Sequence, residues 1–201
     1  MQYPIARIAE KAMVTTHGTW REILYYDGRD ASIALVHGVP EGQETVPVRI
    51  QSHCIAAFVF NSAECDCRDQ MQLAQAYIQA HGQGVVIWLD QDGRGEGHLA
   101  WMLAAKLAAS EGISESDAYA RLGYPNDGRR YVTASHILRD LGVDAVQLLS
   151  NNPKKRDELV DHGVHVSDVR SLLAPGTEEQ LAQKGLAHPG LTTGPPAEPS
   201  P

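Results

Sequence analysis

The 201-residue sequence contains no hydrophobic run near the ~20 residues that a membrane-spanning helix needs. Its N-terminus has no basic flank followed by an apolar segment, so a secretory signal is not expected. Positive charge is also scarce, because 17 Lys and Arg face 25 Asp and Glu and give a formal net charge of −8. Binding to nucleic acid through many phosphate contacts is therefore not expected. We expect a cytoplasmic protein without a membrane or nucleic-acid partner.

Cysteine is limited to Cys54, Cys65 and Cys67, which lie within fourteen residues. An odd number of cysteines without an export signal makes a disulfide framework improbable. Closely spaced thiolates favour zinc, and three protein ligands plus a water are typical of a catalytic zinc site. The spacing brings the sulfurs together if residues 55–64 fold back as a strand and turn. Two alternatives remain open, a structural site closed by His53 and thiols that bind no metal.

Hydrophobic residues make up 43% of the chain, which excludes wholesale disorder and suffices for one large core. Apolar runs predict strands at 31–37, 47–50, 84–90 and 143–149. Helical periodicity predicts helices at 69–81, 98–111, 115–122 and 133–141, and another that opens at 151–155. This order predicts an α/β (mixed α+β) fold, with a strand-rich N-terminal part and a central mixed sheet flanked by helices. We expect one domain over 1–175 and a C-terminal extension over 176–201, disordered from about 185.

Five motifs occur in one order along the chain: RIQSHC (49–54), ECDCRDQ (64–70), DQDGRGEG (90–97), LGYPNDGRR (122–130) and LLSNNPKK (148–155). In this order and spacing they resemble the GTP cyclohydrolase II family, and the resemblance covers about residues 3–175. It implies a homodimeric hydrolase that depends on Zn²⁺ and Mg²⁺ and acts in riboflavin biosynthesis. Such an enzyme opens the imidazole ring of GTP, releases C8 as formate and cleaves off pyrophosphate.

The resemblance also implies a set of site residues. The metal ligands would be Cys54, Cys65 and Cys67. Asp127 would be the proton acceptor and Arg129 the nucleophile, although a guanidinium is nearly always protonated and stabilisation of the departing pyrophosphate by charge is an alternative. The implied substrate-binding residues are Arg49, His53, Gln70, Asp92, Gly93, Arg94, Glu115, Ser150 and Lys155. From local chemistry, Asn152 is expected to cap a helix whose first residue is Pro153, and that N-terminus favours an anion.

The chain departs from the family pattern on the side of the site that faces the base. Gln51 and His53 replace His and Glu, Asp92 replaces Glu, and Glu115 replaces Thr. The family's catalytic tyrosine has no counterpart, since Ala105 or Lys106 occupies its position. Such changes alter which base can form hydrogen bonds with every polar group of the site. The metal and phosphate positions mostly match the family, so we still expect a nucleoside triphosphate substrate, with GTP as the first candidate.

Several alternatives remain open. The product could retain its formamide, or the enzyme could open a pyrimidine nucleotide such as UTP. From other classes, the chain could be a non-catalytic zinc-containing nucleotide-binding protein or a zinc-stabilised interaction module.

Overall fold

The structure, a computed structural model, describes residues 5–63 and 65–172. Its strands are β1 (Ala6–Thr15), β2 (Gly18–Tyr26), β3 (Ala31–His37), β4 (Val46–Ser52), β5 (Gly84–Leu89), β6 (Ala145–Leu149) and β7 (His165–Arg170). Its helices are α1 (Ile55–Phe58), α2 (Cys67–His81), the 3₁₀ turn η1 (Gly93–Gly95), α3 (His98–Glu111), α4 (Glu115–Arg121), α5 (Val132–Asp140) and α6 (Pro153–Asp161). None of these helices is long and apolar enough to span a membrane.

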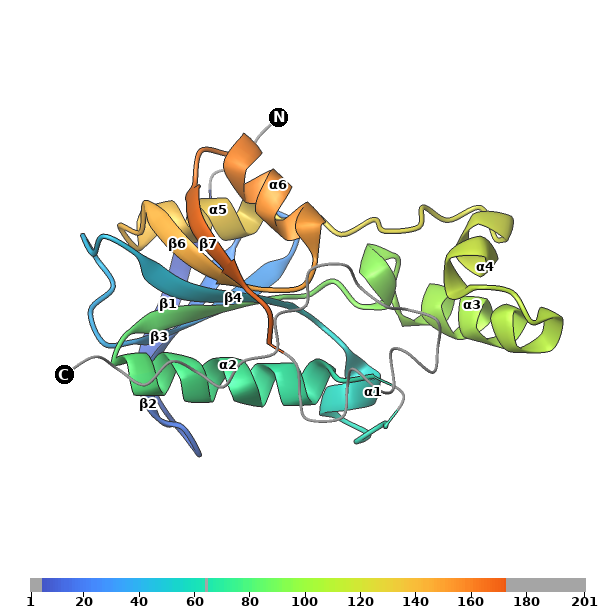
Figure 1. The fold of residues 1–201 in the computed structure, drawn as a ribbon, viewed down its shortest axis with the longest axis horizontal. Coiled ribbons are helices and arrows are strands. Elements are labelled where there is room, and N and C mark those ends of the chain that lie inside the picture. The colour runs from blue at the N-terminus through green and yellow to red at the C-terminus, as the bar shows by residue number, and fades with distance from the viewer. Residues whose placement is uncertain (1–4, 64, 173–201) are drawn as a thin grey trace.

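The strands form a seven-stranded mixed sheet in the order β1-β2-β3-β5-β4-β6-β7 (Figure 1). The pairs β1–β2, β2–β3 and β3–β5 are antiparallel, whereas β5–β4, β4–β6 and β6–β7 are parallel. The mixed sheet with a strand-rich N-terminal part confirms the predicted fold class. The predicted extension over 176–201 lies outside the described residues.

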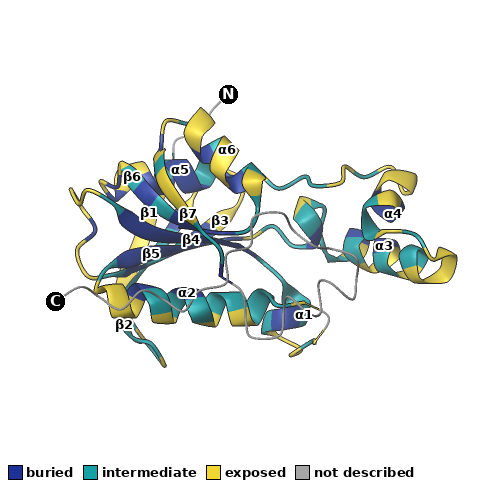
Figure 2. Cartoon of the chain, in the orientation of Figure 1, coloured by how far each residue is buried: buried dark blue, intermediate teal, exposed yellow. Residues whose placement is uncertain are grey.

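Helices cover both faces of the sheet, with α2 on one face and α5 and α6 on the other (Figure 1). The core under α5 and α6 includes Ile50, Leu148 and Leu159, and the core under α2 includes Ile78 and Val86. The pair α3 and α4 projects from one end and has its own small core. Figure 2 shows the central strands buried and much of α3 exposed.

Local signals place several element ends as expected. Asn152 caps α6, because its side-chain oxygen accepts from the Lys154 amide at 2.9 Å, and Pro153 is the first residue of the helix. Helix α2 ends at Gly82, whose φ of 87° lies in the left-handed region that glycine adopts without strain. The predicted helix thus ends as expected but begins at Cys67, two residues earlier.

The segment after Cys54 differs from the prediction. Residues 55–58 form the helical turn α1 rather than a strand. The guanidinium of Arg68 donates to the carbonyls of Ala57 and Phe58 at 2.6 and 3.1 Å, so it satisfies carbonyls that the end of a short helix leaves open. Strand β7 was also not predicted, because its sequence HVSDVR is polar and mostly exposed.

Three parallel strands direct functional segments to one edge of the sheet. The carboxyl end of β4 leads to Cys54, that of β5 to the loop 90–97, and that of β6 to Ser150. Ligands of open α/β sheets bind at this edge. Three of the five motifs therefore converge on one region of the fold.

Candidate active site

The sulfurs of Cys54, Cys65 and Cys67 all lie within 4.8 Å of one another. The Sγ atoms of Cys54 and Cys65 are 3.7 Å apart. Cys54 follows β4, and Cys67 opens α2, so both outer members of the trio are held by regular elements. The structure thus brings together the three predicted metal ligands.

Among the described residues, no His, Asp, Glu or other Cys joins this cluster at metal-binding distance. His53, the alternative fourth ligand, pairs instead with Asp90. Three thiolates suit Zn²⁺ by softness, and a set of three leaves a coordination position for water. The donor set therefore fits a zinc ion with an open position better than a closed structural site.

Hydrogen bonds among the cysteines and their burial shift the pKa values of the three thiols. Hydrogen bonds from the Cys67 side chain and amide lower the pKa of Cys65 to about 6. The bond to Cys65, together with burial, raises the pKa of Cys67, and burial raises that of Cys54. Loading with a metal must therefore release protons.

A chain of hydrogen bonds joins the cysteine cluster to a buried arginine. Asp66, which lies between Cys65 and Cys67, accepts from Gln70 Nε2 at 2.6 Å. The Oε1 atom of Gln70 accepts from Arg49 Nη2, also at 2.6 Å. Gln70 is thus fixed in one orientation between Asp66, beside the cysteines, and Arg49.

Arg49 is a buried cation without a carboxylate partner among the described residues. Its side chain is 3% exposed, and it donates only to neutral oxygens of Gln51, Gln70 and Leu149. Burial lowers the pKa of its guanidinium to about 10. A buried cation with only neutral partners favours an anionic ligand.

Lys155 is a second cation of this kind. It is 5% exposed, and its ammonium donates to the Ile50 carbonyl at 2.8 Å and lies 5.7 Å from the centre of the Tyr131 ring. Burial, followed by repulsion from Arg49 and Arg129, lowers its pKa well below the ordinary value. Arg49 and Lys155 therefore form a region of uncompensated positive charge beside the cysteines' strand.

Arg94 differs from these two cations because it is already neutralised. It forms an ion pair with Glu115 at 2.7 Å and donates to the backbone and side chain of Asn126. Its guanidinium lies over the Tyr119 ring, and its φ of 58° is unusual for a residue other than glycine. The predicted ligands Arg94 and Glu115 thus bind each other and connect the loop 90–97 to α4.

Asp127 and Arg129 form a bidentate pair with distances of 2.8 and 2.6 Å. Burial raises the pKa of Asp127, but the bonds from Arg129 outweigh burial and lower it. Lys154 Nζ donates to the carbonyls of Asp127 and Arg129 at 2.8 and 2.6 Å. The loop 127–129 is therefore held from α6.

The loop 127–129 packs directly on the glycine-rich loop 90–97. The Gly128 amide donates to the Arg94 carbonyl at 2.9 Å. A Cβ atom on Gly95, whose φ is 93°, would lie 2.8 Å from the Gly128 backbone. This close approach requires glycine.

Two histidine–aspartate pairs flank the loop 90–97. His53 hydrogen-bonds Asp90 and packs on the Trp88 ring, and His98 hydrogen-bonds Asp92; both N–O distances are 3.0 Å. The predicted ligands His53 and Asp92 therefore each have a partner within the site. Gly93, the remaining predicted ligand of this loop, is buried, and its carbonyl accepts from Tyr119.

Three further positions complete the predicted set. Ser150 is buried after β6, and its hydroxyl accepts from the Asn152 amide at 3.0 Å. Ala105 is half-buried in α3 and Lys106 is exposed, so neither offers a phenol. Sequence reasoning missed Asp66, Lys154 and Asp90, although all three lie inside or directly beside the quoted motifs.

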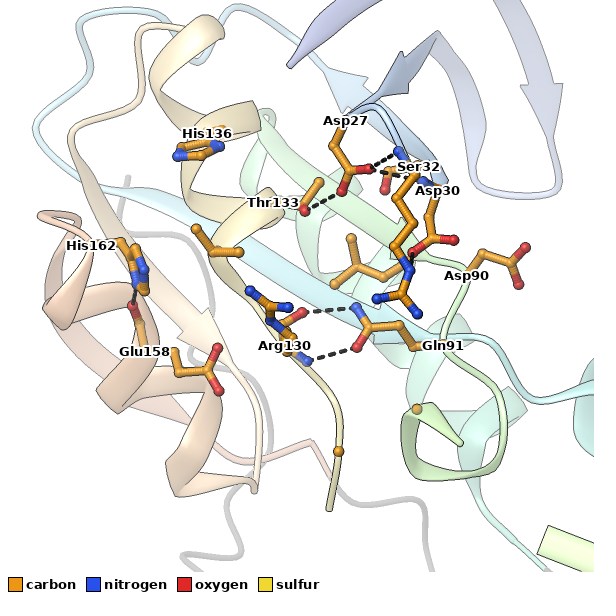
Figure 3. A pocket seen from close by; sticks show the side chains of 15 residues that line it. Asp27, Asp30, Ser32, Asp90, Gln91, Arg130, Thr133, His136, Glu158 and His162 are labelled. Carbon is orange, nitrogen blue, oxygen red and sulfur yellow. Dashed lines mark hydrogen bonds and ion pairs between the residues drawn. The ribbon is translucent and has the colours of Figure 1, made fainter. Parts of the chain in front are cut away.

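A separate cavity of about 490 Å³ lies beside α5 and α6 (Figure 3). Residues from the β2–β3 turn, the end of β5, α5 and α6 line it. Gln91 and Arg130 close one side of it through two hydrogen bonds of 2.8 and 2.7 Å (Figure 3). None of the predicted site residues lines this cavity, so we do not include it in the site.

Comparison with known proteins identifies the family of the chain. A family model described as GTP cyclohydrolase II matches residues 6–171. GTP cyclohydrolase-2 of Streptomyces coelicolor is 39% identical over 180 residues, which cover 88% of this chain and 80% of that protein. The riboflavin biosynthesis protein RibBA of Bacillus mycoides is 38% identical over 177 residues, and the matched part is 87% of this chain but 44% of that protein.

Among solved structures, RibBX from A. baumannii, a two-domain 3,4-dihydroxy-2-butanone 4-phosphate synthase, is 20% identical. It matches with a TM-score of 0.47 over 85% of this chain and 41% of that chain, a similarity too low to support an argument. The family model and the Streptomyces relative carry the assignment. By both, the chain belongs to the GTP cyclohydrolase II family and is a cyclohydrolase, an enzyme that hydrolyses carbon–nitrogen bonds of a ring.

Proposed function

We propose that this chain is a zinc-dependent nucleotide cyclohydrolase that opens the base ring of GTP and releases formate and pyrophosphate. One observation supports this function above the others. The hydrogen-bond chain Asp66–Gln70–Arg49 connects a three-cysteine cluster with an open ligand position to a buried cation that lacks a carboxylate partner. A metal-bound water and a phosphate site side by side suit hydrolysis of a nucleotide.

The chain's own residues hold the substrate. Zn²⁺ bound by the three cysteines would supply an activated water. Arg49 offers a fork of donors for phosphate oxygens, and Lys155 offers a point charge. Since both are buried without a described acidic partner, the phosphates would replace water around them and neutralise them.

We propose that Arg129 stabilises the departing pyrophosphate by charge and does not act as a nucleophile. Burial lowers the pKa of Arg129, but the bonds to Asp127 outweigh burial and raise it above its ordinary value. A nucleophilic guanidinium must lose its proton, and Asp127 opposes that loss. Asp127 is ionised and able to accept a proton once the substrate draws Arg129 towards the phosphates.

We assign recognition of the base to His53 and to Asp92 of the glycine-rich loop 90–97. Asp90 fixes the ring of His53 through its Nδ1 atom, and Asp92 fixes the ring of His98 in the same way. The Nε2 atom of each ring is then the one that can bind a base. A site with fixed polar groups rejects a base that leaves them unpaired. The identity of residue 53 should therefore decide which base is opened.

Further properties are proposed from the family resemblance. Mg²⁺ would accompany the triphosphate, the enzyme would be a homodimer in the cytoplasm, and its product would enter riboflavin biosynthesis.

The test is mass spectrometry of zinc-loaded protein incubated with Mg²⁺ and GTP, ATP, UTP or CTP in separate reactions. Loss of formate and pyrophosphate from GTP supports the proposal. Metal-stripped protein and the Cys54→Ser variant are the controls, and both should be inactive.

Other outcomes separate the alternatives. A GTP product heavier by one water that keeps its formyl group would mean that only the first hydrolysis occurs. Turnover of UTP without turnover of GTP would assign a pyrimidine substrate. Binding of zinc and nucleotide without any product would support the non-catalytic binding protein.

A further inference from the structure

Two buried hydroxyl groups near the site have no hydrogen-bond partner of ordinary geometry among the described residues. They are the Oγ atom of Ser52 and the phenolic oxygen of Tyr131. Ser52 is 6% exposed and Tyr131 is fully buried. Native proteins leave few buried hydroxyls unpaired, because losing water without gaining a partner is unfavourable. Each such group therefore requires an explanation.

The two hydroxyls lie on the same side of the sheet. Ser52 ends β4 and, by strand alternation, shares the face of Ile50, which packs under α5 and α6. Tyr131 is the N-cap residue of α5 and belongs to the same core cluster as Ile50. Burial raises the pKa of the Tyr131 phenol to about 12, although the charge of Arg129 and an approach of the Ser52 hydroxyl lower it, so the two hydroxyls are neighbours. The phenol therefore remains a hydrogen-bond donor at neutral pH.

Two cations, Lys155 and Arg129, lie near Tyr131. The Lys155 ammonium lies 5.7 Å from the centre of the Tyr131 ring, and its only described hydrogen bond goes to the Ile50 carbonyl. An ammonium has three donors, so Lys155 has donors to spare. Two hydroxyl donors beside a cation match an acceptor with several lone pairs and a negative charge. A phosphate oxygen has both, whereas the edge of a base mixes donors with acceptors.

We propose that Tyr131 and Ser52 donate hydrogen bonds to a phosphate oxygen of the bound nucleotide, the same phosphate that Lys155 neutralises. This inference rests on the proposed function, because it needs a phosphate-bearing substrate. Since both oxygens are enclosed, the ligand reaches them only when the Lys155 side chain moves away from the Ile50 carbonyl. Tyr131 thereby becomes a substrate-binding residue of a chain whose α3 has no tyrosine.

The test compares Tyr131→Phe and Ser52→Ala with Tyr25→Phe. Tyr25 is a fully buried phenol of the same sheet, but it donates to Asp140 at 2.6 Å and takes no part in the site. Zinc-loaded proteins are titrated with GTP and with inorganic tripolyphosphate, which has no base. Zinc content and the Tm of the ligand-free proteins are measured alongside.

Tyr131→Phe and Ser52→Ala should each weaken the binding of both ligands by the same factor, about 10- to 100-fold, as expected for a hydrogen bond to a charged group. Their zinc content should stay at the wild-type value. The Tm of Tyr131→Phe should stay close to the wild-type value, because its hydroxyl makes no hydrogen bond of ordinary geometry that the change could remove. Tyr25→Phe should show the reverse, a lower Tm with unchanged affinity for both ligands.

Unchanged affinity of Tyr131→Phe for both ligands, measured where the variant is folded, would overturn the inference. Weaker binding of GTP with unchanged binding of tripolyphosphate would also overturn it, because the contact would then be to the nucleoside. Failure of the proposed function has a different signature, since the zinc-loaded wild-type protein would then form no product from GTP, whatever the variants bind.

Discussion

The Lys155 ammonium donates a hydrogen bond to the carbonyl oxygen of Ile50, 105 residues earlier in the chain, at 2.8 Å. The contact holds a charge of α6 against the carboxyl end of β4. The described acceptor is a neutral carbonyl, so no acidic partner balances the charge of the ammonium in this buried place. The ligand-free protein thus holds an unfavourable charge that an anion relieves.

Removing this charge should lower the affinity for GTP and raise the stability of the ligand-free protein. In Lys155→Met the apolar stem remains and the buried charge is lost, so we expect the ligand-free protein to gain about 1 kcal/mol or more. Affinity for GTP should fall about 10- to 100-fold. Chemical denaturation and calorimetric titration measure the two effects. The matched control is Lys106→Met on the exposed side of α3, and a loss of stability at Lys155 with unchanged affinity would contradict the argument.

The binding of anions should depend on pH through Lys155. Because burial and Arg49 lower its folded-state pKa below 10.5, protons leave the empty site as pH rises through that lowered pKa. A bound anion restores the proton, so affinity for tripolyphosphate should weaken as pH rises through this window. The stability of the ligand-free protein should rise with pH in the same window, because the unfolded state there holds more protons than the folded state. Titrations in two buffers of different ionisation enthalpy measure the proton uptake, and Lys155→Met should lose it.

Asp127→Asn should impair turnover more than binding. The change removes the carboxylate that accepts two hydrogen bonds from Arg129 and serves as the proposed proton acceptor. We expect kcat to fall about 10²- to 10⁴-fold, with affinity for GTP changed far less. Steady-state kinetics and equilibrium binding separate the two effects. Asp157→Asn, an exposed change in α6, should keep both values, and an equal loss in that control would point to a general defect.

Loss of one thiolate should abolish metal binding at the cluster. Cys67→Ser leaves two sulfurs, which are too few to hold zinc against water. Zinc content measured by elemental analysis should fall well below one ion per chain, together with turnover. Wild-type protein stripped by a chelator and reloaded with zinc should recover activity. A fully zinc-loaded and active Cys67→Ser protein would rule out the three-cysteine site.

His53→Glu tests the recognition of the base. The carboxylate would be repelled by Asp90, the present partner of His53, and would offer acceptors in place of the Nε2 atom. We expect the ratio of kcat/KM for GTP to that for UTP to change by about tenfold or more. His165→Glu at the exposed start of β7 is the control. An unchanged ratio in His53→Glu would place base recognition elsewhere.

Local chemistry explains which features the sequence predicts. The apolar run of β5 and the Asn152–Pro153 start of α6 depend on neighbouring residues alone, so both were predicted. Helix α1 was not, since Arg68 supplies hydrogen bonds to its carbonyls from ten and eleven residues away. Sequence-based prediction fails where a distant residue decides the local conformation.

The same limit applies to the site. The cysteine spacing predicts the cluster because its members are close in the chain. The family resemblance implied that Arg94 binds substrate, but its neutralisation by Glu115, 21 residues later, depends on the fold. Tyr131 lies just outside the quoted motifs, and only the surroundings of its hydroxyl in the fold distinguish it.

The order of the chain has a consequence for how the enzyme is assembled. Arg49 reaches the carbonyl of Leu149, 100 residues later, and this contact depends on the parallel pairing of β4 with β6. Pairing at such separation closes a long loop, which makes it slow and places it late in folding. The cysteines lie close together and leave the ribosome well before α6 is made. If the cysteines bind zinc as proposed, we expect that they can do so before the sheet closes, and hence before the chain has a place for a nucleotide.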